Sequence, residues 1–184
     1  PGETLHMHQL GVARRCVEAI EQQLVNTSVE CKYAANLKKG RATVEALGYI
    51  AQRYGALLSR QSDRDFPRTK FGTSIMSIAK KEGKDYSGML LCILVALASE
   101  AGQEIVGDLR FATTQIDVIE QIISMEEFLK HGRITPKGLR NLPKTIIHFI
   151  NTINTACIRK GMGTRLIKNH LYFHIPEYIK LWGH

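Results

Sequence analysis

Residues 89–98 read MLLCILVALA, and this run of ten apolar residues decides the fold class. A run of this length forms either a buried strand or a helix that is buried on nearly every side. Its leucines and alanines favour a helix, and the segments on both sides have helical spacing. We therefore predict a central helix that begins at Lys84 or Asp85. The run falls short of the roughly 18 residues that a membrane span needs.

Amphipathic helices are predicted before this central run. Apolar residues recur at helical spacing over residues 5–25, although Gly11 weakens that helix and a short non-helical lead-in is an alternative for its start. A second helix is predicted over about 41–58. The polar segment 59–73 contains a proline and a glycine and is predicted to be a loop. A helical turn or two is predicted at 75–79.

Two more helices are predicted after the central run. An acidic helix should cover Leu109–His131 and end at Gly132. Thr135 is a predicted cap, followed by Pro136 in the first turn of a helix that runs to residue 160. Pro143 should interrupt this helix lightly at most. The sum is an all-α fold: one domain of six or seven helices over residues 1–184, without strands.

The last segment, GMGTRLIKNHLYFHIPEYIKLWG at 161–183, is the most specific local sequence in the chain. Its apolar residues fall at roughly helical spacing, and Pro176 divides them. This proline either kinks one helix or lies in the first turn of a second. Tyr178 and Trp182 could stack on nucleic-acid bases, but their spacing with the apolar residues indicates that they belong to the core.

His170 and His174 lie four residues apart and should share one helix face. Such a pair could bind a metal ion. The glutamate of an HExxH motif is absent from HLYFH, and no third ligand is fixed nearby. The alternative is that both imidazoles are hydrogen-bonded within a packed, basic helix.

The net charge of +8 is distributed in blocks. Residues 32–84 hold 12 basic and 4 acidic side chains, and residues 132–184 hold 9 and 1. Residues 85–131 hold 2 basic and 8 acidic side chains. Two basic blocks suit contact with a polyanion, but pairing of the acidic block with a basic one within the chain suits the pattern equally well.

The cysteines and the chain ends indicate an intracellular fragment. Cys16, Cys31, Cys92 and Cys157 are scattered and form no CxxC pair, which favours free thiols in a reducing compartment over disulfides or zinc. No secretory signal is visible. The chain begins without a methionine, and we interpret it as an excised part of a larger protein.

Three polar side chains, Glu3, His6 and His8, lie close together near the start. A carboxylate beside an imidazole can bind a divalent metal or take part in acid–base chemistry. An ordinary helix start with exposed histidines explains the same residues. No GxSxG motif, phosphate-binding glycine loop or paired-cysteine zinc spacing occurs in the chain.

Three segments, in this order, resemble one family. They are ETLHMHQLGV at 3–12, KKEGKDYSGMLLCILVALA at 80–98 and KNHLYFHIPEYIKLWG at 168–183. Together they resemble eukaryotic DDE transposases with an RNase H-like fold, of the CACTA class and the Kyakuja–Dileera–Zisupton group. The first resembles the family's second catalytic-acid segment, the middle a polar segment leading into a buried helix, and the last a late segment of the form H-L-x-x-H-L/I-P.

The resemblance implies a helical insertion between the second and third catalytic acids of such an enzyme. The three carboxylates of the parent protein would bind Mg²⁺, and Glu3 would be a metal ligand at the second position, where the family has Asp. Glu3 and His6, three positions later, are then the candidate catalytic residues. The other two acids would lie outside this chain, which alone should bind no cofactor and should be catalytically inert. A nuclear location would follow.

Three hypotheses follow from these patterns. In the first, the chain is a transposase-like insertion whose basic side chains contact DNA, with the remainder of the parent chain as its other partner and no membrane. In the second, it is an all-α protein-interaction module without a nucleic-acid role. In the third, it is a metalloenzyme that uses Glu3, His6, His170 and His174. The residues predicted to contact DNA phosphates are Lys38, Lys39, Arg41, Arg165 and Lys168.

Overall fold

The computed structural model describes residues 8–27, 46–50, 53, 83–131, 134–157 and 170–182. These residues form helices and no strand, so the predicted all-α class is confirmed. Six of the α-helices in the described ranges have seven or more residues. Residues 46–50 are helical, within the helix predicted over 41–58. The predicted loop at 59–73 and the turn at 75–79 lie outside the described residues.

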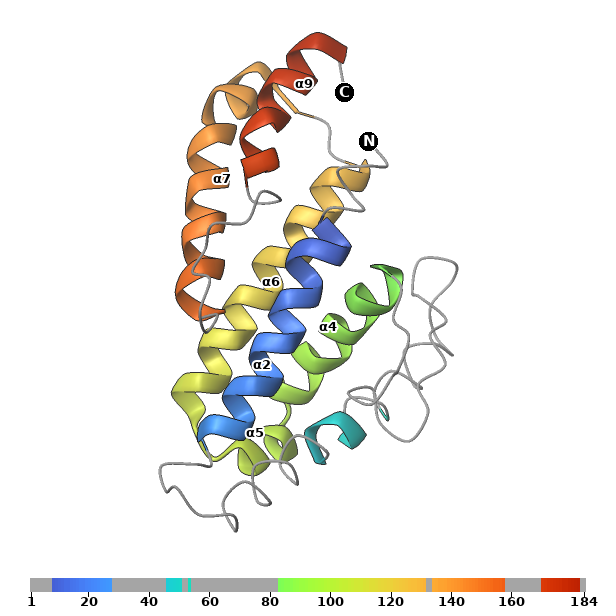
Figure 1. Ribbon diagram of the computed structural model, residues 1–184, viewed down its shortest axis with the longest axis vertical. Coiled ribbons are helices and arrows are strands. Elements are labelled where there is room, and N and C mark those ends of the chain that lie inside the picture. The colour runs from blue at the N-terminus through green and yellow to red at the C-terminus, as the bar shows by residue number, and fades with distance from the viewer. Residues whose placement is uncertain are drawn as a thin grey trace.

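The core is built around helices α2 (Arg14–Thr27), α4 (Gly83–Ala98) and α6 (Leu109–His131). The predicted central helix is α4, which starts one residue before Lys84, the earlier of the two predicted starts. Figure 1 shows α6 running opposite to α2 and α4 and lying between them and the C-terminal helices. Within the apolar run of α4, six side chains have no exposed surface: Met89, Leu90, Cys92, Ile93, Ala96 and Leu97. Their burial stabilises the fold by the hydrophobic effect.

The helix predicted over residues 5–25 begins, in its described part, with a π-helical turn, η1 (His8–Ala13), which continues directly into α2. Gly11, the residue that weakens this helix in the sequence, is buried inside the π-helical turn. A π-helix bonds residue i to i+5 and therefore holds an extra residue compared with an α-helix. This turn sets which side chains of the N-terminal segment face the core.

A sharp corner joins α4 to the short helix α5 (Glu100–Val106), and the two axes meet at 87°. The Ser99 hydroxyl donates to the carbonyl of Ala96 at 2.7 Å and accepts from the backbone N–H of Gly102 at 3.1 Å. Gly107 ends α5 with φ of 68°, a left-handed conformation that suits glycine. No single helix in the described ranges is long and apolar enough to span a membrane; α4 and α5 meet that test only when joined across this bend.

Substitution of Gly102 by alanine should destabilise the corner. A Cβ atom at this position would overlap the backbone carbonyl of Ala96, which cannot move without disturbing the end of α4. We expect the free energy of unfolding to fall by about 1–3 kcal/mol, measured by urea denaturation. Gly107→Ala is the comparison: its Cβ would meet nothing within 4 Å, so only left-handed backbone strain, about 1–2 kcal/mol, should appear. A Gly102→Ala variant as stable as the wild type would contradict the clash.

The C-terminal part consists of α7 (Pro136–Ala156), the 3₁₀ turn η3 (Tyr172–His174) and α9 (Ile175–Trp182). The predicted cap is confirmed, because the Thr135 hydroxyl accepts from the N–H of Gly138 at 3.1 Å. Pro143 lies inside α7 on an exposed side and does not break the helix. The predicted end at residue 160 is wrong: α7 ends at Ala156, because Cys157 leaves the helical region with ψ of 60°.

Pro176 lies in the first turn of a second helix, as one of its two predicted alternatives states, and does not kink a single helix. It is the second residue of α9, where its missing N–H costs no helical hydrogen bond. The prediction that Tyr178 belongs to the core is wrong, because 50% of its surface is exposed. Ile175 and Ile179 occupy the inner side of this short helix, and Tyr178 lies off that side. The side chain of Trp182 lies outside the description.

Candidate functional site

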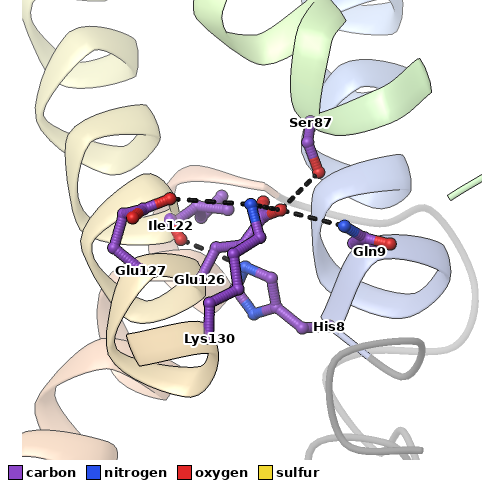
Figure 2. Close-up of polar contacts among 7 residues, drawn as sticks. All are labelled: His8, Gln9, Ser87, Ile122, Glu126, Glu127 and Lys130. Carbon is purple, nitrogen blue, oxygen red and sulfur yellow. Dashed lines mark hydrogen bonds and ion pairs between the residues drawn. The ribbon is translucent and has the colours of Figure 1, made fainter. Parts of the chain in front are cut away.

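A buried carboxylate joins three helical segments that are far apart in the sequence. Oε1 of Glu126, on α6, accepts hydrogen bonds from Nε2 of Gln9 on η1 and from Oγ of Ser87 on α4, each at 2.9 Å. Nζ of Lys130, one turn later on α6, reaches the same oxygen at 2.9 Å. Figure 2 shows these groups converging on Glu126 between α4 and η1. We call these four residues the Glu126 network.

The Glu126 network keeps its carboxylate ionised. Burial alone would raise the pKa of Glu126, but the hydrogen bonds from Gln9, Lys130 and Ser87 outweigh it and hold the pKa below its usual value. Burial opposes the charged form of Lys130, yet pairing with Glu126 and Glu127 raises its pKa. The network therefore combines one anion, one cation and two neutral donors, with the Glu126 side chain 5% exposed.

His8 forms the second link across the sequence. Its Nε2 lies 3.0 Å from the carbonyl oxygen of Ile122, and its Nδ1 lies 2.6 Å from the hydroxyl of Tyr172. A carbonyl can only accept, so Nε2 carries the proton, and Nδ1 of the neutral ring accepts from Tyr172. Phe149 of α7 stacks on the imidazole with ring centroids 6.2 Å apart. Figure 2 shows the ring directed toward Ile122 beneath the Glu126 network.

The environment of His8 favours the neutral imidazole. Burial lowers its pKa to about 4, against the opposing attraction of Glu126. Burial also raises the pKa of Tyr172, so its hydroxyl stays protonated and donates. Both ring nitrogens of His8 are occupied and its surface is fully buried. His8 is therefore neither an exposed histidine nor a free acid–base or metal-binding group, which corrects both interpretations for His8, while Glu3 and His6 lie outside the described residues.

His170 and His174 do meet, as their spacing predicts. Their Nε2 atoms are 3.2 Å apart, and Nδ1 of His174 lies 3.3 Å from Oε2 of Glu177. His170 is exposed and the His174 side chain is 38% exposed, so these imidazoles lie at the surface. Both rings are hydrogen-bonded, as the alternative of a packed, basic helix states, but they lie at the surface rather than in the core.

The remaining predicted site residues lie outside the described ranges. These are Glu3, His6, Lys38, Lys39, Arg41, Arg165 and Lys168. The part of the chain that the structure describes, including the surroundings of His170 and His174, brings no three metal-ligating side chains together. The described residues alone therefore do not fit a Mg²⁺ centre with three carboxylates. The metalloenzyme hypothesis needs Glu3 and His6 to lie beside His170 and His174. The contact between His8 and Tyr172 brings the first and last segments together, but Glu3 and His6 lie outside the described residues, so this hypothesis stays a prediction.

Comparison with protein-family models, with curated proteins and with solved structures finds no match. The family resemblance therefore depends on the residues of its three segments. Each of these segments contributes to the links just described: Gln9 and His8 belong to the first, Ser87 to the second and Tyr172 to the third. Residues of the first two segments bond directly to α6, a helix that none of the three segments contains, and Tyr172 of the third segment is linked to it through His8.

The cysteines are free thiols in the described ranges, as predicted. Cys16 and Cys92 are fully buried, and Cys157 is partly buried. The side chain of Cys16 is hydrogen-bonded to Cys157, and this contact and burial raise the pKa of the Cys16 thiol well above its usual value. Burial raises the pKa of Cys92 to about 12. Neither Cys16 nor Cys92 is thus suited to nucleophilic chemistry.

The sequence reasoning missed a basic side of α7. Lys137, Arg140 and Lys144 are all exposed, and within the described ranges none of them forms an ion pair. Their spacing of three and four residues places them on one side of the helix. That spacing is visible in the sequence and could have identified them. These three side chains form an exposed cationic surface on α7, in addition to the basic residues predicted from the sequence to contact DNA.

The acidic helix α6 does not pair with a basic block where the structure can be described. Lys130 of α6 itself is the partner of Glu126 and Glu127. Most of the basic side chains of residues 32–84 lie outside the described ranges, so the predicted pairing with them stays a prediction.

Proposed function

We propose that the chain is the helical insertion region of a DDE transposase-like protein. In this role it would hold the segment of the second catalytic acid in position and contribute to DNA binding. The observation that carries the proposal is the meeting of the three family-like segments through Glu126, His8 and Tyr172.

The positioning role follows from the location of Glu3. This residue lies five positions before His8, whose ring is held on both sides by hydrogen bonds and is packed against Phe149. Metal-ion catalysis is sensitive to carboxylate displacements of about 1 Å, so the segment that carries such a ligand must be held by rigid elements. Helices α4, α6 and α7 are those elements. In the parent protein Glu3 would then be a Mg²⁺ ligand beside His6.

The DNA-binding role is supported by the basic side of α7. From Lys137 to Lys144 the helix rises by about 10 Å, a length over which three cations can follow a phosphate backbone. Contacts of this kind are independent of base sequence and weaken as salt is added. Lys38, Lys39, Arg41, Arg165 and Lys168 stay predicted contacts of the same kind.

DNA binding and its salt dependence test this role. Fluorescence anisotropy of a labelled duplex should show binding that weakens steeply between about 50 mM and about 200 mM salt. The combined variant Lys137→Ala, Arg140→Ala, Lys144→Ala should bind more weakly, and the slope of log K against log salt should become shallower by about 3. Removal of two exposed uncharged side chains of α7, Asn151→Ala with Thr155→Ala, should change neither quantity.

Absence of binding at low salt would instead support the protein-interaction module. One observation favours that second candidate: three large apolar side chains near the C-terminal end, Phe173, Tyr178 and Leu181, are between 43% and 74% exposed. Exposed apolar groups of this size often mark a contact with another protein surface. In the transposase-like protein, the remainder of the parent chain would be such a surface.

A further inference from the structure

We infer that His170 and His174 form a two-imidazole binding site for a divalent transition-metal ion, with Zn²⁺ as the favoured occupant. The inference does not depend on the proposed function. Among the histidines whose side chains the structure describes, these two are the pair whose ring nitrogens face each other. The other described histidines are His8, which is fully hydrogen-bonded and buried, and His148, which has no described histidine beside it.

The separation of the two nitrogens fits a shared metal ion. Zinc–imidazole bonds of about 2.0–2.1 Å with tetrahedral angles place two ligand nitrogens about 3.3 Å apart. The observed separation between the two Nε2 atoms is 3.2 Å. The same distance also fits an N–H···N hydrogen bond, in which one ring donates to the other. A metal ion would replace the proton of that hydrogen bond, with little movement of either side chain.

Glu177 supplies the outer contact that metal-binding histidines commonly have. Its Oε2 lies 3.3 Å from Nδ1 of His174. When Nδ1–H donates to this carboxylate, the lone pair of His174 is fixed on Nε2, the atom that faces His170. A carboxylate–histidine contact of this kind selects the tautomer and orients the ring. The His170 ring is exposed, so it can exchange its proton with water and offer Nε2 as well.

The local backbone explains why the rings meet. The 3₁₀ turn η3 begins two residues after His170 and ends at His174, and it directs Tyr172 into the core while His170 and His174 remain at the surface. Two protein ligands leave the other coordination positions to water, so the ion should exchange readily. Imidazole ligands suit zinc, copper and nickel, whereas Mg²⁺ prefers oxygen ligands. The site is therefore distinct in chemistry from a carboxylate centre for Mg²⁺.

Calorimetric titration of the chain, free of any histidine tag, with zinc chloride tests the site. We expect one saturable ion per chain, and His170→Ala and His174→Ala should each weaken binding by at least about 10-fold. Glu177→Gln should weaken it by about 10-fold or less, because its carboxylate is well exposed. His148→Ala, which removes an exposed histidine of α7, should bind as the wild type does. Circular dichroism verifies that each variant retains its helices.

Histidine-ring NMR spectra supply a second measurement. Zinc should shift the ring signals of His170 and His174 and leave those of His8 unchanged, because both nitrogens of His8 are occupied. Undiminished one-to-one binding in His170→Ala and His174→Ala would overturn the inference and place the ion elsewhere. Absence of saturable binding by the wild-type chain would overturn it as well.

Discussion

Replacement of Glu126 by alanine is expected to lower the free energy of unfolding by about 2–4 kcal/mol, as measured by urea denaturation followed by circular dichroism. The carboxylate accepts three hydrogen bonds on one oxygen, and its removal leaves Gln9 and Ser87 without an acceptor in a partly buried location. Lys130 contributes less to the loss, because its side chain is 30% exposed and can turn toward water. The loss arises from unsatisfied donors rather than from a cavity alone.

The neighbouring residue provides the matched control for this prediction. Glu127 also approaches Lys130, at 3.5 Å, but its side chain is 59% exposed. Glu127→Ala should therefore cost about 0–1 kcal/mol, as exposed ion pairs usually do. Equal losses in the two variants would show that Glu126 has no special role. Glu126→Gln should fall between them, because it removes the charge and keeps an acceptor.

Acidification below about pH 6.5 is expected to destabilise the protein through His8. In the folded chain the pKa of His8 is about 4, whereas an unfolded histidine has its ordinary value near 6.5. The unfolded state therefore binds a proton as the pH falls below about 6.5, while the folded state resists until about pH 4. Stability is complete above the unfolded pKa and declines through this window. From about pH 7 to about pH 5 the free energy of unfolding should fall by about 2 kcal/mol through His8 alone.

Urea denaturation at several pH values measures this decline. The groups that face His8 are Glu126 and Lys130 of α6 and Tyr172 of η3, and all of them keep their charge state over that range because their pKa values lie outside it. His8→Gln keeps a donor and an acceptor but cannot titrate, so its stability should depend less on pH, even if it is lower at neutral pH. His148→Gln, at an exposed position, should keep the wild-type dependence. A decline as steep in His8→Gln as in the wild type would contradict the assignment.

Signals that are local in the sequence predicted the helices well. The bounds of α6 at Leu109–His131 and the cap at Thr135 agree with the prediction, because capping residues and helical periodicity act within a few residues of one another. The central helix followed from a run of ten apolar residues. The end of α7 was predicted four residues late, since nothing local distinguishes Ala156 from the residues after it.

The buried polar links could not be predicted from the sequence, because their partners are far apart. His8 and Tyr172 are separated by 164 positions, and Gln9 and Glu126 by 117. The sequence shows Glu126 only as one of several acidic residues in a long helix, without an indication that it is buried. Tyr178 was misplaced for a related reason: a short helix presents its apolar residues on a side that only its neighbours define.

The π-helical turn at His8–Ala13 determines the rotational register of His8 and Gln9 relative to α2. An α-helix turns by about 100° per residue, so the extra residue that a π-turn holds rotates the side chains at the start of the turn by about that angle relative to α2. His8 and Gln9 face α6 in this register, and in a continuous α-helix they would face other neighbours. Insertion or deletion within the turn, more than substitution, is therefore the kind of evolutionary change that would turn His8 and Gln9 away from α6.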